Sequence, residues 1–281
     1  MKSNIKIALA CIVFLTNISQ SIGQDSSKEL VKDKSYILNS QYQSGKTYNS
    51  QIDAALEIDV RMGDDDALSD NRIRTMIVAL TTENGSNQDV PFKLRFTYFD
   101  ESSSGELSDP ESDIILDTSI AGANGNLDNG NLAIKNVCGV EPIYLDNIQN
   151  VLKPVFELAN LHFPKEAMSV GDSFQNRFGV SYPIGGFGIV ETKQDMVITL
   201  LSVEDDMAYL SIKTTVSGKF VFDGIVYPVV GSGTSQLTLD IQNQYFTSYD
   251  NNQTDIISFN SGGTDITVRS TEISSNKTLI R

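Results

Sequence analysis

From Ala54 to Val268, apolar and polar residues alternate in a series of short runs. A period of two is typical of strands with one buried and one solvated face, and serine and threonine fill many intervening positions. The apolar members are Ala54, Leu56, Ile58, Val60, Ile73, Ile77, Ala79, Phe92, Leu94, Phe96, Tyr98, Met196, Ile198, Leu200, Ala208, Leu210, Ile212, Phe220, Phe222, Leu237, Leu239, Ile241, Ile266 and Val268, with Met76, Val78 and Leu80 on the other face of the second run. The pattern predicts a mostly β fold of antiparallel curved sheets.

Turn-forming residues separate the apolar runs. Asn84-Gly85, Glu204-Asp205-Asp206 and Asn251-Asn252 lie between runs that we expect to pair as hairpins. Gly185 to Gly188 is also expected to be a hairpin turn, since it follows Pro183 and leads into a strand. The stretch 121–131 is rich in glycine and asparagine and is expected to be a loop.

One segment has the period of a helix. After Asp146, a suitable N-cap, apolar residues recur at helical spacing up to Ala159. They are Ile148, Val151, Leu152, Val155, Phe156 and Ala159. Pro154 lies inside the stripe and predicts a kink, and Pro164 ends the element. The sequence thus predicts a helical connection over 146–163, between a first β half over 36–145 and a second over 164–281.

The two halves begin alike. Gly45-Lys46-Thr47-Tyr48 and Gly171-Asp172-Ser173-Phe174 both give glycine, a charged residue, a small hydroxyl residue and an aromatic residue. Alternating strands follow in each case. The shared motif followed by alternating strands predicts two similar halves, with Tyr48 and Phe174 at equivalent core positions.

The first 23 residues resemble an export signal. Lys2 and Lys6 precede an apolar run too short to span a bilayer, and small residues precede a cleavage site after Gly23. An alternative is a lipoprotein signal with Cys11 lipidated. Cleavage after Gly23 predicts a soluble periplasmic or extracellular protein of a bacterial cell envelope, with a flexible leader over 24–35.

Composition narrows the chemistry. Losing Lys2 and Lys6 but no acid takes the net charge from −15 to −17, which disfavours nucleic acid as a partner. No later segment is apolar enough to be a transmembrane helix. Beyond the signal, Cys138 and His162 are the sole cysteine and histidine, so a His- and Cys-rich metal site is excluded. We expect Cys138 to be a small buried residue rather than a reactive thiol, and His162 to be a packed or capping residue.

Carboxylates leave two kinds of chemistry open. A hydrolase with paired carboxylates needs two facing acids, and 36 Asp and Glu residues can supply them. Asp117-Thr118-Ser119 approaches an aspartic-protease motif but lacks its glycine, so we expect a turn. Asp64 to Asp66 with Asp70, and Asn124 to Gly130, could offer oxygen ligands to calcium, but neither fits an EF-hand loop. We expect solvated acidic loops and neither metal nor cofactor.

The order of several short motifs carries a family resemblance. These are Phe163-Pro164, Val170 to Phe174, Val203 to Leu210, Gly231 to Asp240 and Asn243 to Ser248. The chain resembles, over 163–250 and loosely over 42–60, a family of secreted, often lipid-anchored bacterial proteins defined as a domain of unknown function. It departs from the family where Phe174 replaces a common tryptophan and Asn243-Gln244-Tyr245 replaces a Thr-Gly-Trp-like turn.

The resemblance implies no functional residues. Its strand layout is similar to that of periplasmic lipoprotein-carrier folds, where a curved antiparallel sheet with helical cover encloses an apolar cavity.

Together these features favour a non-catalytic envelope protein that binds or carries an apolar ligand, such as a lipid, between the helix and the concave sheet face. The ligand-binding residues would be Val151, Leu152, Val155 and Phe156. The alternative function is that of a structural or protein-interaction module, and a carboxylate-based hydrolase is the third hypothesis. A carrier keeps an apolar cavity open, whereas a structural module fills that space with its own side chains.

Overall fold

The computed structural model describes residues 34–85, 89–107, 116–128, 131–139, 161–184, 188–222, 224–261 and 263–281. Within these ranges the chain forms strands and no helix, so there is no helix there that could cross a membrane. The strands are β1 (Ser35–Tyr36), β2 (Thr47–Met62), β3 (Leu68–Thr82), β4 (Asp89–Ser104), β5 (Gly122–Asp128), β6 (Asn131–Cys138), β7 (Met168–Ser169), β8 (Ser173–Ile184), β9 (Gly188–Glu204), β10 (Met207–Phe222), β11 (Ile225–Asp240), β12 (Tyr245–Ser261) and β13 (Thr264–Ile280). The predicted mostly β, antiparallel fold is confirmed.

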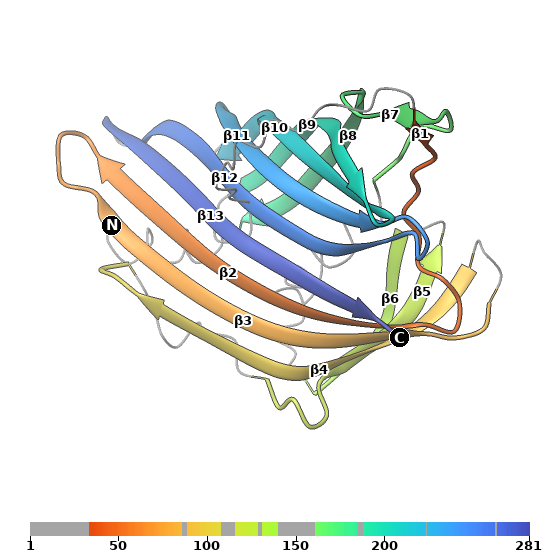
Figure 1. Cartoon of the computed structure of the whole chain (residues 1–281). Helices are drawn as coiled ribbons and strands as arrows, with labels where there is room; N and C mark the ends of the chain where they lie inside the picture. The colour runs from red at the N-terminus through yellow and green to blue at the C-terminus, as the bar shows by residue number, and fades with distance from the viewer. Residues whose placement is uncertain are drawn as a thin grey trace.

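Eleven strands form one sheet in the order β6-β5-β4-β3-β2-β13-β12-β11-β10-β9-β8 (Figure 1). Each strand pairs antiparallel with its neighbour. The chain starts mid-sheet at β2 and steps outward to β6, then resumes at the opposite edge with β8 and returns to β13. The first and last strands of this sheet therefore lie side by side, and β1 pairs with β7 in a separate two-stranded sheet.

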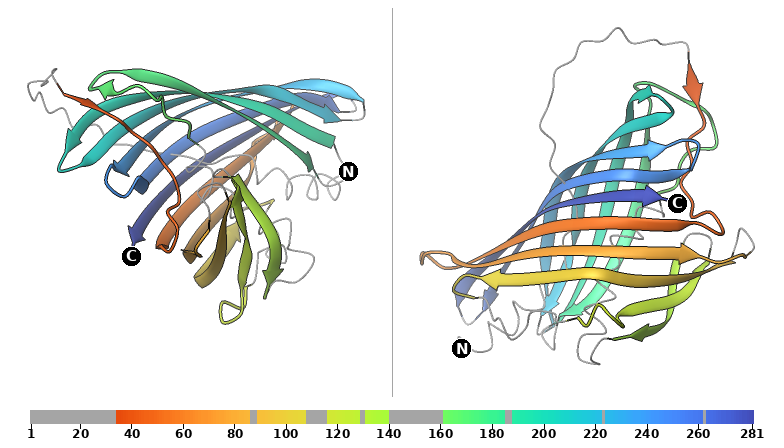
Figure 2. Two further views of the ribbon diagram at one scale, coloured as in Figure 1. Left: turned by 90° about the vertical axis from the view of Figure 1, so that its right-hand side faces the viewer. Right: turned by 60° about the horizontal axis from the view of Figure 1, so that its bottom comes forward.

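The large sheet is bent into an arch (Figure 2). Buried and exposed side chains alternate along the strands, so the buried ones share one face. On that face, rings from strands two places apart meet: Tyr48 of β2 lies 4.4 Å from Tyr245 of β12, and Phe220 of β10 lies 5.8 Å from Phe259 of β12. Side chains of non-adjacent strands converge on the inside of a curve. The buried face is thus the concave face.

A bulge in β4 changes which face its residues occupy. Ile77 pairs with Tyr98, but Val78 pairs with Phe96, so Thr97 is an extra residue. Phe96 is fully buried, whereas Tyr98 is 46% exposed. The prediction that Tyr98 continues the apolar face of Phe92, Leu94 and Phe96 is therefore wrong, because the bulge shifts the alternation by one residue.

Most of the glycine-rich stretch predicted to be a loop is a strand. Residues Gly122–Asp128 form β5, which pairs with β4 on one side and with β6 on the other. A Cβ atom at Gly122 would lie 2.5 Å from the backbone oxygen of Leu94. Glycine is needed here because the two strands approach more closely than a side chain allows.

The predicted turns have mixed outcomes. Asn84 and Gly85 lie between β3 and β4, and Asp205 and Asp206 link β9 to β10 with φ angles of 49° and 63°, so both are confirmed. Gly188 pairs with Ile184 across the β8–β9 hairpin, as expected. Asn251-Asn252 lies inside β12, so that predicted turn is wrong.

Several predictions fall outside the described residues. The signal peptide over 1–23 and almost all of the flexible leader over 24–35 do so, although Ser35 belongs to β1. The helix over 146–163 also falls there, apart from Leu161, His162 and Phe163, which are not helical. The structure gives no support for the kinked helix: the described end of the predicted segment is not helical, and the rest stays a prediction.

The starts of the two predicted halves share local geometry. Gly45 and Gly171 have φ angles of 75° and 95°. The hydroxyls of Thr47 and Thr81 form a hydrogen bond of 3.1 Å, and the hydroxyls of Ser173 and Thr199 form one of 2.8 Å. In the next register position Tyr48 pairs with Leu80 and Phe174 pairs with Ile198.

The positions of these two strands in the sheet differ, however. β2 has neighbours on both sides, whereas β8 is an edge strand. Tyr48 is buried and Phe174 is only partly buried. The turn and first pairs are repeated, but equivalent core positions for the two aromatic residues are not observed, because one continuous sheet surrounds them unequally.

Candidate functional site

Polar side chains occupy part of the concave face between apolar clusters, in one group on β11 to β13 and another on β3 and β4, with Leu56 and Ile58 of β2 between the two groups. On β12, the alternating positions from Tyr249 to Ile257 begin and end apolar but are polar between. On β13, Val268 likewise gives way to polar residues on the same face. We define the polar belt as Asp70, Arg72, Arg74, Glu101, Ser235, Asn251, Gln253, Asp255, Ser270 and Glu272. Its residues come from β3, β4, β11, β12 and β13.

Apolar residues flank the belt along the strands. One cluster lies toward the β2–β3 and β12–β13 hairpins and contains Leu56, Ile58, Val60, Val190, Phe220, Val229, Ile257, Ile266 and Val268. At the other ends of the strands, a second cluster centres on β3 to β5 and a third on β8 to β12. The concave face therefore presents an apolar, polar, apolar sequence of surfaces.

Several belt atoms have no hydrogen-bond partner among the described residues. Gln253 Nε2 donates to Asp255 Oδ2 at 2.9 Å, and Ser235 Oγ donates to Asn251 Oδ1 at 3.4 Å. Within the described part of the chain, Asp255 Oδ1, Asn251 Nδ2 and Ser270 Oγ have no partner, although these residues are only 1–2% exposed. Each such buried group costs about 1–3 kcal/mol unless something bonds to it.

Glycines in β11 make room for the belt. Gly231 pairs with Asp255, and Gly233 pairs with Gln253. A Cβ atom at Gly231 would lie 1.8 Å from Asp255 Oδ1 and 2.7 Å from the backbone oxygen of Thr254. The Asp255 carboxylate thus lies over Gly231, and the Gly-Ser-Gly segment is explained by the side chains of the neighbouring strand.

The β3 side of the belt is a network of ion pairs. Arg72 Nε lies 3.1 Å from Asp70 Oδ2, and Arg74 Nη2 lies 2.5 Å from Glu101 Oε2. Arg72 Nη1 is also 3.9 Å from Glu101 Oε1. Asp70 Oδ1 has no hydrogen-bond partner within the described ranges. Both guanidinium groups are therefore held by carboxylates.

Burial raises the pKa of Asp255 to about 6, and the Gln253 hydrogen bond offsets this only in part. In the sheet register Ser270 lies opposite Asp255; the nearest titratable group on this face of β13 is Glu272, opposite Gln253, and Asp70 and Arg72 follow beyond β2. A protonated Asp255 is therefore favoured in the folded chain at mildly acidic pH.

We expect the stability of the protein to fall between about pH 4 and pH 6 through Asp255. Since its folded pKa is raised, the stabilising effect of its proton is complete below the unfolded pKa of 3.8 and is lost as pH rises through about 6. The loss amounts to roughly 3 kcal/mol. Urea unfolding across this range should show the fall in the wild type and a flatter profile in Asp255→Asn. Parallel profiles would contradict the assignment.

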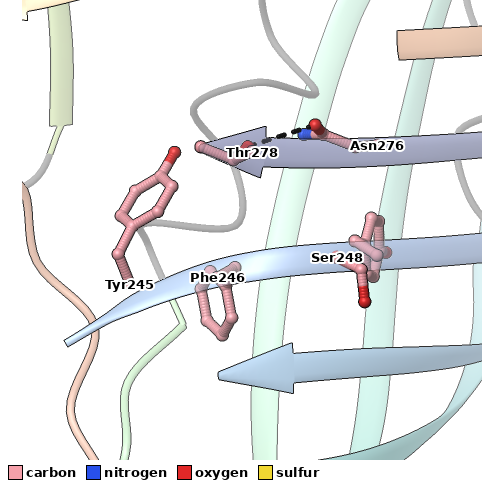
Figure 3. A pocket seen from close by; sticks show the side chains of 6 residues that line it. Tyr245, Phe246, Ser248, Asn276 and Thr278 are labelled. Atoms are coloured by element: carbon pink, nitrogen blue, oxygen red, sulfur yellow. Dashed lines mark hydrogen bonds between the residues drawn. The ribbon is translucent and has the colours of Figure 1, made fainter. Parts of the chain in front are cut away.

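A small hollow lies near one end of the concave face (Figure 3). Tyr245, Phe246, Ser248, Tyr249, Asn276 and Thr278 line it. These residues come from β12 and β13, and the dashed line in the figure is the bond from Thr278 Oγ1 to Asn276 Oδ1 at 3.3 Å. Its empty volume is about 160 Å³, including space open to solvent. Ligand pockets usually enclose about 300–1,000 Å³.

Three buried tyrosines stand beside this hollow. Tyr245 donates its hydroxyl to the Tyr42 hydroxyl at 2.9 Å, and the backbone N–H of Gln43 donates to the Tyr48 hydroxyl at 2.7 Å. Burial raises the pKa of all three phenols, so they stay protonated. The segment that carries Tyr42 is tied to the β11–β12 turn by the bond from the Gln41 backbone N–H to the Gln244 backbone oxygen at 2.9 Å.

The residues predicted to bind ligand were Val151, Leu152, Val155 and Phe156. All four lie outside the described residues, so this prediction stays open.

The side chains of Cys138 and His162 are both exposed. Cys138 lies on the edge strand β6, where its Sγ donates to the backbone oxygen of Gly122 at 3.5 Å. The side chain of His162 is solvated, although its backbone pairs with the Asn176 amide group at 3.0 and 3.1 Å. The prediction that Cys138 is buried is therefore wrong, because Cys138 lies on an edge strand, and the side chain of His162, predicted to be packed or capping, is exposed and not packed.

Of the acidic motifs, Asp117 and Asp64 to Asp66 are at the surface, whereas Asp70 is buried. Asp117 Oδ1 accepts bonds from the Ser119 backbone N–H and hydroxyl, which lower its pKa and confirm the predicted turn. Asp64 to Asp66 occupy the exposed β2–β3 turn, but Asp70 is buried against Arg72, so the four acids do not form one group. Across the described residues no group of three or more His, Cys, Asp or Glu could hold a metal ion.

The belt itself was missed from the sequence. Its signal was present: Asn251, Gln253 and Asp255 are in phase with the buried residues Tyr249 and Ile257. The pair Asn251-Asn252 favours a turn when only the sequence is considered, and that prediction hides the continuous alternation through β12.

Comparisons with known proteins place the chain in no family. No family model and no curated protein matches it. Two solved structures align over most of the chain: one described as lipid–protein interactions in lipovitellin (13% identity, TM-score 0.48, 86% of this chain and 26% of that one), and Ail, the attachment invasion locus protein of Yersinia pestis (8% identity, TM-score 0.18, 84% and 100%). The chain spans about a quarter of the lipovitellin chain. Neither likeness is strong enough to argue from.

Proposed function

We propose that this is a non-catalytic binding or carrier protein whose concave sheet face holds an amphipathic ligand of the lipid class. The observation that carries the proposal is the polar belt, where buried polar atoms between two apolar surfaces have no hydrogen-bond partner among the residues that the structure describes. A ligand with apolar and polar parts would satisfy both. The proposal keeps the ligand class expected from the sequence but places its site on the sheet.

The burial of the concave face sets a condition on binding. Leu56, Ile58 and Val268 are all buried, and the hollow near Tyr245 is smaller than a usual ligand pocket. Uptake therefore requires the buried side chains of the concave face to become accessible to the ligand.

The same burial favours a second candidate function, that of a structural module whose own side chains fill the concave side of the sheet. The two functions differ in whether an apolar probe binds.

We expect N-phenylnaphthylamine, an uncharged fluorescent probe, to bind saturably and to raise the melting temperature of the protein. Val268→Thr should weaken binding by roughly tenfold, because it places a hydroxyl on the apolar face at nearly constant shape. Val230→Thr is the matched control, since Val230 is exposed on β11. Fluorescence titration, with circular dichroism to check folding, measures both.

Absence of saturable binding to the wild type would leave the structural module as the better function. Equal affinity in both variants would place the probe elsewhere. Native mass spectrometry of the protein from its natural envelope fraction shows independently whether a lipid accompanies it.

We also propose export to the periplasm or beyond, with cleavage after Gly23, and membership of the secreted family suggested by the motif order. N-terminal sequencing tests the cleavage site, and a lipidated Cys11 would contradict cleavage after Gly23.

A further inference from the structure

We infer that the polar belt selects ligands whose polar group donates hydrogen bonds, a hydroxyl or amino group, over ligands with an anionic group. The inference rests on the proposed function and adds the chemistry of the ligand's polar part. It follows from which belt atoms are unsatisfied and which are already bonded.

The unsatisfied atoms are mainly acceptors. Asp255 Oδ1 and Asp70 Oδ1 each lack a partner among the described residues, and each is a carboxylate oxygen, which accepts when ionised. Ser270 Oγ can donate or accept, and Asn251 Nδ2 is the one obligate donor of the set. A ligand that donates to the Asp255 carboxylate and accepts from Asn251 matches the unsatisfied atoms on β12, whereas Asp70 lies three strands away. Hydroxyl groups do both.

The belt's cations are not available to an anion. Arg72 is bonded to Asp70, and Arg74 is bonded to Glu101, which also lies 3.9 Å from Arg72. With four carboxylates (Asp70, Glu101, Asp255, Glu272) against two guanidinium groups, the ionised belt carries a net charge of −2. A carboxylate or phosphate placed against it would meet repulsion in a region shielded from water.

The apolar surfaces orient the rest of the ligand. Along β12 the belt positions run from Asn251 to Asp255, followed by Ile257 on the same face. In the other direction lie Tyr249 and Phe246. An alkyl chain can therefore lie along the strands to either side while its polar group stays at the belt.

Laurylamine, lauryl glucoside and laurate share one alkyl chain and differ in their polar groups, so they test the inference. Displacement of N-phenylnaphthylamine is measured at about pH 8, where Asp255 is ionised. We expect the amine and the glucoside to bind on the order of tenfold more tightly than laurate. Tightest binding by laurate would overturn the inference.

Asp255→Asn should weaken laurylamine binding on the order of tenfold and leave laurate unchanged or improved, since it removes the charge and keeps the shape. Asp250→Asn makes the same change on the other face of β12 and should alter neither. Equal effects of the two variants would overturn the inference. If only the probe and laurate bind, the inference is overturned but the proposed function stands. If no compound binds, the probe included, both the inference and the proposed function are overturned.

Discussion

Gly231→Val is expected to lower the free energy of unfolding by about 3 kcal/mol or more and to abolish ligand binding at the belt. The new Cβ would lie 1.8 Å from Asp255 Oδ1, so that carboxylate must move. It would also lie 2.7 Å from the backbone oxygen of Thr254, which cannot move without disturbing β12. Urea denaturation measures the loss.

Gly179→Val provides the matched control for this substitution. Gly179 lies on edge strand β8, and the nearest atom to a Cβ there is 4.0 Å away. Valine suits an exposed strand position, so its effect should stay within about 0.5 kcal/mol. A double variant that adds Asp255→Ala to Gly231→Val should recover part of the loss. Equal losses at the two glycines would show that the close approach of β11 and β12 is not the cause.

Phe96→Ala is expected to cost about 3–5 kcal/mol of stability, because a fully buried ring is removed from the cluster around β3, β4 and β5. Tyr98→Ala, two residues further along β4, should cost less than about 1 kcal/mol. Chemical denaturation of both variants measures the difference. The comparison is sensitive to the bulge at Thr97, since simple alternation would bury both rings.

Similar losses in the two variants would mean that β4 runs without the bulge. A loss in Phe96→Ala below about 1 kcal/mol would contradict the assignment of that residue to the core. The slope of unfolding against urea should be alike in all variants, which confirms that each measurement concerns the same folded state.

The sequence determined the local features of this fold. Alternation over Leu56, Ile58 and Val60 identified the buried side of β2, because neighbouring side chains of any strand point to opposite faces. Asp205 and Asp206 marked a turn for an equally local reason, since these residue types tolerate positive φ angles. Such features need no information about distant segments.

The tertiary structure decided which strands pair with each other. β13 pairs with β2, setting Ile266 against Met62, and no feature of either segment alone specifies a partner so distant in sequence. The same pairing logic makes Gly122–Asp128 a strand, because β4 and β6 supply its hydrogen bonds. Tyr98 faces outward since β4 carries one residue more than β3 opposite.

The candidate site belongs to both levels. Polar residues at Asn251, Gln253 and Asp255 were fixed in phase with the core by their spacing in the sequence. Their burial was decided by the tertiary structure: strand pairing sets Gly231 of β11, which has no side chain, beside Asp255 of β12, and the curvature of the sheet places Arg72 and Asp70 on the same concave face. Spacing determines which face a residue occupies, because the pleat is local, whereas curvature determines what that face meets, because it arises from pairing along the whole chain.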